Sequence, residues 1–378
     1  MSEYQYYEFR AIDRPLTDRQ MRELRAISTR AAISRMSFSN HYEYGDLKAN
    51  PRDLLVKYFD ASLYFAHWLH LEVAFRFSKD AVDVKALRRY AGGHTLDIRS
   101  AGSDVVVAMS VEGDGDSFDA ADDGSSWLSS LMGLRSDIAG GDERALYLAW
   151  LLDVQYGVVD DETTEPSQPE GLGDLSPTLA SFVDIMGLDR DLVAAAAEGG
   201  VRIPAAPAAR ELEHWLAGLG PDEHVALLSR VARGDGSVGA EISRRYRRHA
   251  PPRPSGLPLR TAGALRERAE RMAETRRQVA RQHEAQARAR RERQEQAARA
   301  RDLAELATRV PQAWQRIDAL VATKRPRDYD AAVALLADLR DVSEQSGRAV
   351  QFAKRVSQLR EAHATKPSLL ARLKNAGF

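Results

Sequence analysis

The chain has 378 residues, of which 44% are hydrophobic and 29% are charged. This composition excludes a chain that is disordered throughout, and the length allows two or three domains. The absence of cysteine excludes disulfides, thiolate zinc sites, iron–sulfur clusters and cysteine nucleophiles. No apolar run reaches the roughly 18 residues that span a bilayer, and the first residues lack the pattern of a signal peptide. We therefore expect a cytoplasmic protein without a membrane partner.

The formal net charge of -1 conceals two blocks of opposite sign. Residues 103–165 contain 15 Asp and Glu against two Arg, whereas residues 244–301 contain 18 Arg against six Glu. Opposed blocks of this kind can steer association with partners or with each other, but they say little about the fold.

Residues 1–159 are predicted to form an α+β domain with a mainly antiparallel sheet, because strands and helices interleave along them. Thr17 can cap one helix within a capping box, and Asn50 with Pro51 can begin another. We expect this second helix to continue through Leu63, and the arrangement to be ferredoxin-like in part. Apolar periodicity places strands at 4–12, 35–44, 71–77, 95–99 and 104–112, and further helices at 125–138 and 143–155.

The segment 112–124 carries several closely spaced Asp residues that could suggest a calcium site. The EF-hand spacing is not met, because Phe118 occupies a ligand position and no Gly follows the third acidic position. We therefore expect a solvated acidic loop here.

Two linkers are predicted to organise the middle of the chain. Residues 160–177 are acidic and rich in Pro and Gly, and residues 251–260 are rich in Pro. Between them, residues 178–250 are predicted to form a small helical subdomain. Its helices are expected near 178–198, 207–218, 221–233 and 237–249.

Residues 261–310 are predicted to form one long helix rich in Arg and Glu. Leu265, Met272 and Val279 stand seven residues apart, but the apolar seam then fades, so a coiled coil is limited to the first heptads. Ion pairs four residues apart each support such a helix by about 0.2 to 0.5 kcal/mol. The expected pairs are Glu267 with Arg271, Glu284 with Arg288, Arg291 with Glu295, and Glu295 with Arg299. We expect a stiff, solvated spacer that the three apolar residues anchor at its start.

Residues 311–378 are predicted to form a C-terminal helical hairpin with facing apolar stripes. The stripe residues that we expect to bind a partner are Tyr329, Val333, Leu336, Phe352, Val356 and Leu359. Residues 328–378 resemble the helical hairpin that closes many bacterial SWIM-type zinc-finger proteins, and they are similar in outline to a tetratricopeptide unit. The markers of this resemblance are Tyr329, Ala332, Leu336, Gly347 and Leu359. The chain has no Cys and so lacks the zinc motif of that family, and the resemblance implies a partner-binding helical module without metal.

The N-terminal block shows a second resemblance. Residues 1–29, MSEYQYYEFRAIDRPLTDRQMRELRAIST, together with 58–68, YFDASLYFAHW, resemble the opening of an uncharacterised bacterial protein family. The resemblance covers about the N-terminal two-thirds of the chain. It implies a soluble α+β protein and no particular reaction.

Catalytic motifs are absent from the sequence. It contains no phosphate-binding loop, no dinucleotide-binding glycine motif, no nucleophile elbow and no HExxH zinc motif. His67 and His70 stand three residues apart at what could be a helix end, which is a legitimate metal spacing, but their apolar setting favours ordinary packing. We therefore expect no enzyme, no cofactor, no metal and no small-molecule substrate, and an enzyme with a site near His67 and His70 in the N-terminal domain is the third hypothesis.

Nucleic acid is the main alternative partner. The RRYRR segment places Tyr246 among four Arg, a combination suited to phosphate contact and base stacking. The candidate residues are Arg244, Arg245, Tyr246, Arg247 and Arg248, with Arg276 and Arg277 on the long helix. Interspersed Glu residues weigh against a pure phosphate-binding tract. The strand with Tyr4, Tyr6 and Tyr7 is similar to an RNA-binding platform but lacks its basic and glycine residues, so packing in the sheet core is favoured.

Taken from the sequence alone, the favoured hypothesis is a non-enzymatic adaptor or scaffold that docks a protein partner through its C-terminal helices in a bacterial multi-component system. The alternative is a nucleic-acid-binding accessory protein that uses the basic segment 244–301. The predicted architecture is an α+β domain followed by an all-α region, with a long charged helix and a C-terminal helical hairpin.

Overall fold

The computed structural model describes residues 4–68, 70–113, 123–198, 205–249 and 259–378. The chain divides into two compact units, Met1–Arg276 and Arg277–Phe378. The first unit contains an antiparallel sheet with helices, and all the remaining elements are helical, so the predicted fold class is confirmed. No helix in the described ranges is both long and apolar enough to cross a membrane. The predicted acidic loop at 112–124 and Pro-rich linker at 251–260 lie largely outside the described residues.

Seven strands of the first unit form a single sheet in the order β2-β3-β1-β4-β5-β7-β6. Every neighbouring pair is antiparallel. Because β1 is antiparallel to both β3 and β4, these two strands are parallel to each other with β1 between them, and the helix α2 (Pro51–Tyr58) connects them. This is one split βαβ unit, in line with the expectation of a sheet that is ferredoxin-like in part. The strands are β1 (Gln5–Arg10), β2 (Ala32–Ile33), β3 (Ser37–Tyr42), β4 (Ala61–Ala66), β5 (His70–Ser78), β6 (Leu96–Ala101) and β7 (Asp104–Glu112).

The strand β4 corrects the prediction that the helix after Asn50 continues through Leu63. That helix, α2 (Pro51–Tyr58), begins at its Asn50 cap as predicted but ends at Tyr58. Residues of β4 pair with β1 on one side and β5 on the other, and almost all of them are buried. A central strand that is buried on both faces shows no clear polar alternation, so its apolar run is easily mistaken for helix. His67 and His70 therefore lie around the β4–β5 connection and not at a helix end.

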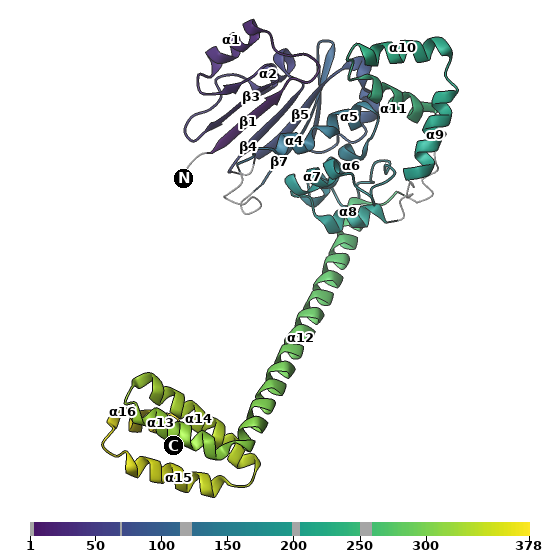
Figure 1. The fold of residues 1–378 in the computed structure, drawn as a ribbon. Coiled ribbons are helices and arrows are strands. Elements are labelled where there is room, and N and C mark those ends of the chain that lie inside the picture. The colour runs from purple at the N-terminus through teal and green to yellow at the C-terminus, as the bar shows by residue number, and fades with distance from the viewer. Residues whose placement is uncertain (1–3, 69, 114–122, 199–204, 250–258) are drawn as a thin grey trace. The chain divides into compact units, whose positions relative to one another are not determined.

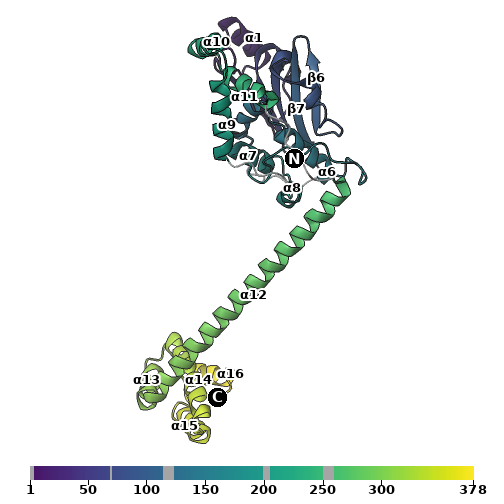
Figure 2. The same cartoon turned by 90° about the vertical axis from the view of Figure 1, so that its right-hand side faces the viewer.

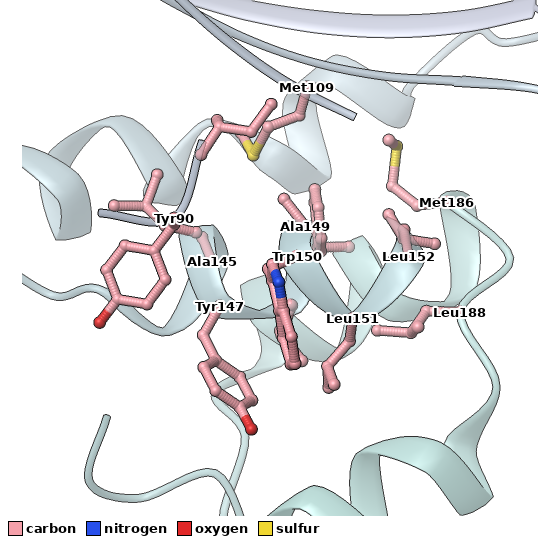
Figure 3. Close-up of a cluster of buried hydrophobic side chains, with 14 of the residues drawn as sticks. Tyr90, Met109, Ala145, Tyr147, Ala149, Trp150, Leu151, Leu152, Met186 and Leu188 are labelled. Carbon is pink, nitrogen blue, oxygen red and sulfur yellow. The ribbon is translucent and has the colours of Figure 1, made fainter. Parts of the chain in front are cut away.

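Two helical layers cover the two faces of the sheet (Figure 1). On one face, α1 (Asp18–Ile27) and α2 pack on Phe9 and Phe38, and Thr17 forms the predicted capping box with Gln20. The other face is covered by α4 (Trp127–Leu131), α5 (Gly133–Ala139), α6 (Arg144–Gln155), α7 (Pro177–Ile185) and α8 (Arg190–Ala197). Figure 3 shows Met109 of β7 reaching down to the side chains of α6.

The boundaries of the first unit differ from the predicted domain divisions. In the segment 160–177, Glu165 and Leu172 are buried, and α7 and α8 share one core with the sheet. The short elements η1 (Lys79–Ala81) and α3 (Val84–Leu87) follow β5. The helices α9 (Ala205–Ala217), α10 (Pro221–Ala232) and α11 (Val238–His249) form a group beside the sheet (Figures 1 and 2).

The long helix α12 (Ala262–Thr308) has 47 residues, close to the predicted span. After it, the second unit contains more than the predicted hairpin: α14 (Pro326–Gln345) contacts α13 (Val310–Ala322), α15 (Ala349–Ala362) and α16 (Pro367–Asn375) (Figure 2). Pro326 begins α14 and Pro367 begins α16, and Gly347, with a φ of 68°, follows the C-terminal cap of α14.

A buried carboxylate fastens the segment before β6 to α6. Asp153 is fully buried, and its Oδ1 accepts the backbone N–H groups of His94 at 3.0 Å and Thr95 at 2.9 Å. Gly93 passes so close that a Cβ at that position would overlap the carboxyl group of Asp153, whereas a Cβ on Gly92 would meet nothing within 4 Å. The absence of a side chain at residue 93 therefore permits this contact.

We predict that Gly93→Ala destabilises the first unit by about 1 to 3 kcal/mol, because the added methyl must displace Asp153 from its two backbone donors. Gly92→Ala is the matched control and should leave the unfolding midpoint nearly unchanged. Tryptophan fluorescence during urea unfolding measures both, since four of the five tryptophans belong to residues 1–276. Equal midpoints for the two variants would contradict this role of Gly93.

Candidate interaction surfaces

The start of α12 is fixed to the first unit by an ion pair between the buried carboxylate of Glu165 and the half-buried guanidinium of Arg260. The guanidinium of Arg260 donates from Nε to Oε1 of Glu165 at 2.9 Å and from Nη2 to Oε2 at 3.0 Å. The hydroxyl of Tyr147, on α6, donates to the same Oε2 at 2.6 Å (Figure 3 shows this side chain). Thr164 and Thr261 form an isolated antiparallel bridge beside the pair. We call Glu165, Arg260 and Tyr147 the latch.

The latch also satisfies the end of a helix. Arg260 donates from Nη1 to the carbonyl oxygen of Ala195 at 2.8 Å and from Nη2 to that of Ala196 at 2.9 Å, both in the last turn of α8. Burial raises the pKa of Glu165, but the hydrogen bonds from Arg260 and Tyr147 outweigh it and hold this pKa below its ordinary value. The latch thus joins residues 160–177, α6, α8 and the start of α12.

Buried residues of α12 are confined to its two ends, where Leu303 is buried near the C-terminal end and Leu306 packs against the core of the second unit. Leu265 and Ala269 are buried in the core of the first unit, and Met272 packs against it. Every residue from 275 to 302 is exposed, so these 28 residues form a solvated helix as predicted. Val279 is 47% exposed, so the prediction that it helps to anchor the helix is wrong. A valine without a neighbouring surface cannot contribute burial, whatever its heptad position.

The ion pairs of α12 agree only in part with the expected ones. Glu267 and Arg271 pair at 3.4 Å as expected, but Arg288 pairs with Glu292 at 3.0 Å. Other arginines bind carboxylates of other helices: Arg276 contacts Asp191 of α8 at 2.6 Å, and Arg299 contacts Asp338 and Asp341 of α14 at 2.6 and 2.9 Å. Arg277 begins the second unit.

The RRYRR segment lies on α11 and faces two directions. Arg245 pairs with Glu223 at 2.7 Å, and the ring of Tyr246 lies 5.8 Å from that of Trp215. Tyr246 is half-buried and packs within the group of α9, α10 and α11. Arg244, Arg247 and Arg248 instead line a small cavity between α11, α3 and the α5–α6 connection.

The C-terminal candidates form the core of the second unit. Five of the six are at most 9% exposed and pack with Trp314, Ile317, Leu369 and Leu373, and Val333 is partly buried against them. The buried residues are Tyr329, Leu336, Phe352, Val356 and Leu359. Because these side chains are occupied by one another, a partner that docks on this bundle must contact its polar surface.

The polar surface of the second unit is strongly basic. Residues 277–378 contain 21 Arg and Lys against 12 Asp and Glu, a formal charge of +9. Residues 1–276 hold the other 33 basic and 43 acidic residues, a charge of -10. Lys324, Arg325 and Arg327 are exposed at the α13–α14 connection, and none of them makes an ion pair with another described residue. We call these three residues the basic corner.

Histidines and tyrosines of the first unit take part in packing. The ring of Tyr4 lies 4.7 Å from that of His67 and 6.0 Å from that of His41. His70 lies 3.5 Å from Glu112. Tyr4 and Tyr6 pack on one face of the sheet and Tyr7 on the other, so they form no single platform. Within the described ranges, no group of three or more His, Asp or Glu residues could hold a metal ion.

The sequence matches no family model, and no curated protein or solved structure matches it.

We predict that Arg260→Ala lowers the stability of the first unit by about 3 kcal/mol, because it leaves the carboxylate of Glu165 buried without its cation. Arg268→Ala is the matched control, since Arg268 pairs with Glu198 at the surface and should matter little. Urea unfolding followed by tryptophan fluorescence compares the free energies of unfolding of the two variants, and equal losses would contradict the prediction.

The same substitution should change the acid sensitivity of the first unit. Because folding lowers the pKa of Glu165, the stabilisation is present above the ordinary glutamate range near pH 4.3 and is lost as the pH falls through the lower, folded-state pKa. Arg260→Ala should therefore flatten the stability profile between about pH 5 and pH 3. An unchanged slope would show that the latch carries no proton linkage.

Within the second unit, Leu336→Ala should cost about 2 to 5 kcal/mol, because Leu336 is fully buried at the centre of the bundle. Val350→Ala, at a position that is 85% exposed, should change stability by less than about 0.5 kcal/mol. Thermal unfolding followed by circular dichroism distinguishes these outcomes, and similar losses for both variants would refute the core assignment.

Proposed function

We propose that the protein is a non-enzymatic adaptor that docks a protein partner through the surface of its C-terminal helices, in a bacterial multi-component system. The observation that carries this proposal is the run of 28 exposed residues within α12, which joins two units that each have a separate hydrophobic core. A catalytic domain needs no such segment, whereas a protein that presents two modules to different partners does.

The composition of the exposed segment supports a connecting role. It is rich in Ala, Arg, Glu and Gln, which are strong helix formers, and it has no apolar seam for a partner helix. A Gly/Ser linker would behave as a flexible coil, whereas a helical connection of this composition is semi-rigid. The sequence thus favours a helix that keeps its form in water without a binding partner along its length.

The charge of the second unit supports an acidic docking surface on the partner. The unit carries a formal charge of +9, and the basic corner concentrates three of its cations on one connection. Complementary charge raises the rate of association and sets its orientation more than it raises affinity. The proposed partner is therefore a protein with an acidic face, bound in a salt-sensitive manner.

Nucleic acid is the second candidate, because the exposed part of α12 between residues 277 and 301 has eight Arg against three Glu. If the protein binds DNA or RNA, it should retard the nucleic acid in a gel. This binding should weaken as the salt concentration rises, because phosphate contacts release counterions. The candidate residues Arg244 and Arg245 can be tested directly: Arg244→Ala and Arg245→Ala should weaken retardation. Absence of retardation even at low salt would remove this candidate.

The adaptor proposal predicts that tagged full-length protein recovers one stoichiometric protein partner after nuclease treatment. Replacement of the basic corner, Lys324→Ala with Arg325→Ala and Arg327→Ala, should abolish recovery of that partner while the thermal unfolding of the second unit stays unchanged. The matched control replaces three exposed arginines of α12, Arg290→Ala with Arg291→Ala and Arg293→Ala, and should retain the partner. Mass spectrometry of the recovered complex gives the identity and the ratio.

Three outcomes would count against the adaptor. Recovery of a lone monomer under gentle extraction contradicts it. Loss of all co-purifying material on nuclease treatment favours the nucleic-acid candidate. Equal loss for both triple variants would show that overall charge, and not the C-terminal bundle, holds the partner.

A further inference from the structure

A cavity of about 200 Å³ lies where α11 meets α3 and the α5–α6 connection. Arg89, Arg244, Arg247 and Arg248 are among the residues that line it, together with the apolar Leu87 and Ile138. Three of these arginines come from the RRYRR segment, because residues three and four apart share one face of a helix. Arg89 comes from a different part of the chain, so the fold brings four cations to one concave site.

Three carboxylates, Asp83, Asp142 and Glu143, also line the cavity, and each already accepts hydrogen bonds. Asp83 caps α3 and accepts the backbone N–H groups of Lys85 and Ala86, both at 3.1 Å. Asp142 is 7% exposed at its side chain and accepts from Nη2 of Arg144 at 2.7 Å. The third, Glu143, accepts from Arg89 at 2.6 Å and from the hydroxyl of Tyr90 at 2.8 Å.

The arginines of α11 that line the cavity have fewer charged partners than these carboxylates have. Arg244 donates to the carbonyl oxygen of Ala81, an uncharged acceptor. Arg247 is 3.5 Å from Asp142, which Arg144 already occupies. Arg248 is exposed, and it forms no ion pair within 4.0 Å with any residue that the structure describes. Guanidinium hydrogens therefore remain for an anion at this site.

Docking of α11 does not depend on Arg248. Gly140 lies against α11 so closely that a Cβ there would be 3.3 Å from the Cβ of Ser243, and Val238 at the start of α11 is 1% exposed. Backbone proximity and apolar burial thus hold the helix in place. The charges that line the cavity are in excess of what this packing requires.

We infer that this cavity binds a phosphate-type dianion, presented as inorganic phosphate or as the end group of a phosphomonoester. A planar guanidinium matches the oxygens of a phosphate in pairs, and several converging arginines are the usual recognition of a doubly charged group. The volume accommodates the phosphoryl group, while the remainder of a larger ligand must lie outside. A phosphodiester within a strand would have to leave the cavity on two sides, so a terminal phosphate fits better. This site is independent of the adaptor role.

The test is calorimetric titration of the full chain with inorganic phosphate at constant ionic strength. Saturable binding of one phosphate per chain is expected. Arg248→Ala should weaken it by roughly ten-fold or more, because a charge-assisted hydrogen bond is lost. Arg248→Lys keeps the charge but loses the planar guanidinium, so its affinity for phosphate should lie between those of the wild type and Arg248→Ala. Arg22→Ala, an exposed arginine on α1 at the other face of the sheet, is the matched control and should bind like the wild type.

A second titration distinguishes the sources of the phosphate. A short oligonucleotide with a 5′-phosphate is compared with the same oligonucleotide carrying a 5′-hydroxyl, and with glycerol 3-phosphate. Binding of both phosphomonoesters, but not of the 5′-hydroxyl oligonucleotide, supports phosphate binding in the cavity. The phosphomonoester that binds more tightly identifies the class of molecule that supplies the phosphate. Absence of saturable phosphate binding overturns the inference. An equal loss in Arg248→Ala and Arg22→Ala overturns it as well, since that result reflects net charge alone.

Discussion

The latch of Glu165, Arg260 and Tyr147 decides how the chain is organised. It brings together residues that are 95 positions apart and closes the end of α8 with the same guanidinium. An ion pair with this little exposure is no strong source of net stability, because desolvation of the two charges offsets most of their attraction. The ion pair instead makes the arrangement specific, because any other position of the chain would leave the buried carboxylate of Glu165 unpaired at a large cost in free energy. The start of α12 is thereby fixed at one position on the first unit.

What the sequence predicted well depended on local signals. The capping box at Thr17 and the Asn50–Pro51 start each involve residues within one turn, so they could be read directly and are confirmed. The strand β4 was missed because its pairing on both sides removes the polar alternation that marks a half-buried strand. The latch could not be found either, since Glu165 is one of many acidic residues in its segment and its partner is distant in sequence.

The candidate surfaces also show this difference between local sequence signals, which could be predicted, and contacts between distant residues, which could not. The apolar stripes of the C-terminal helices were identified, but their period says only that one face is buried and not whether the chain or a partner buries it. The structure assigns those stripes to the bundle's own core, which moves the docking role to its basic surface. The arginines of RRYRR were noted as a group, yet Arg89 could not be joined to them, because only the packing of α11 against α5 brings α3 close.

The opposite charges of the two units have a practical consequence for handling the protein. Their near cancellation gives an isoelectric point of about 6.8, where proteins lack the mutual repulsion that keeps them apart in solution. Net charge is nevertheless a poor guide, since -10 and +9 reside on different units of the same chain. Near neutral pH, cation-exchange and anion-exchange media can both retain such a chain, each through a different unit. Added salt should increase its solubility by screening the attraction between unlike units of neighbouring molecules.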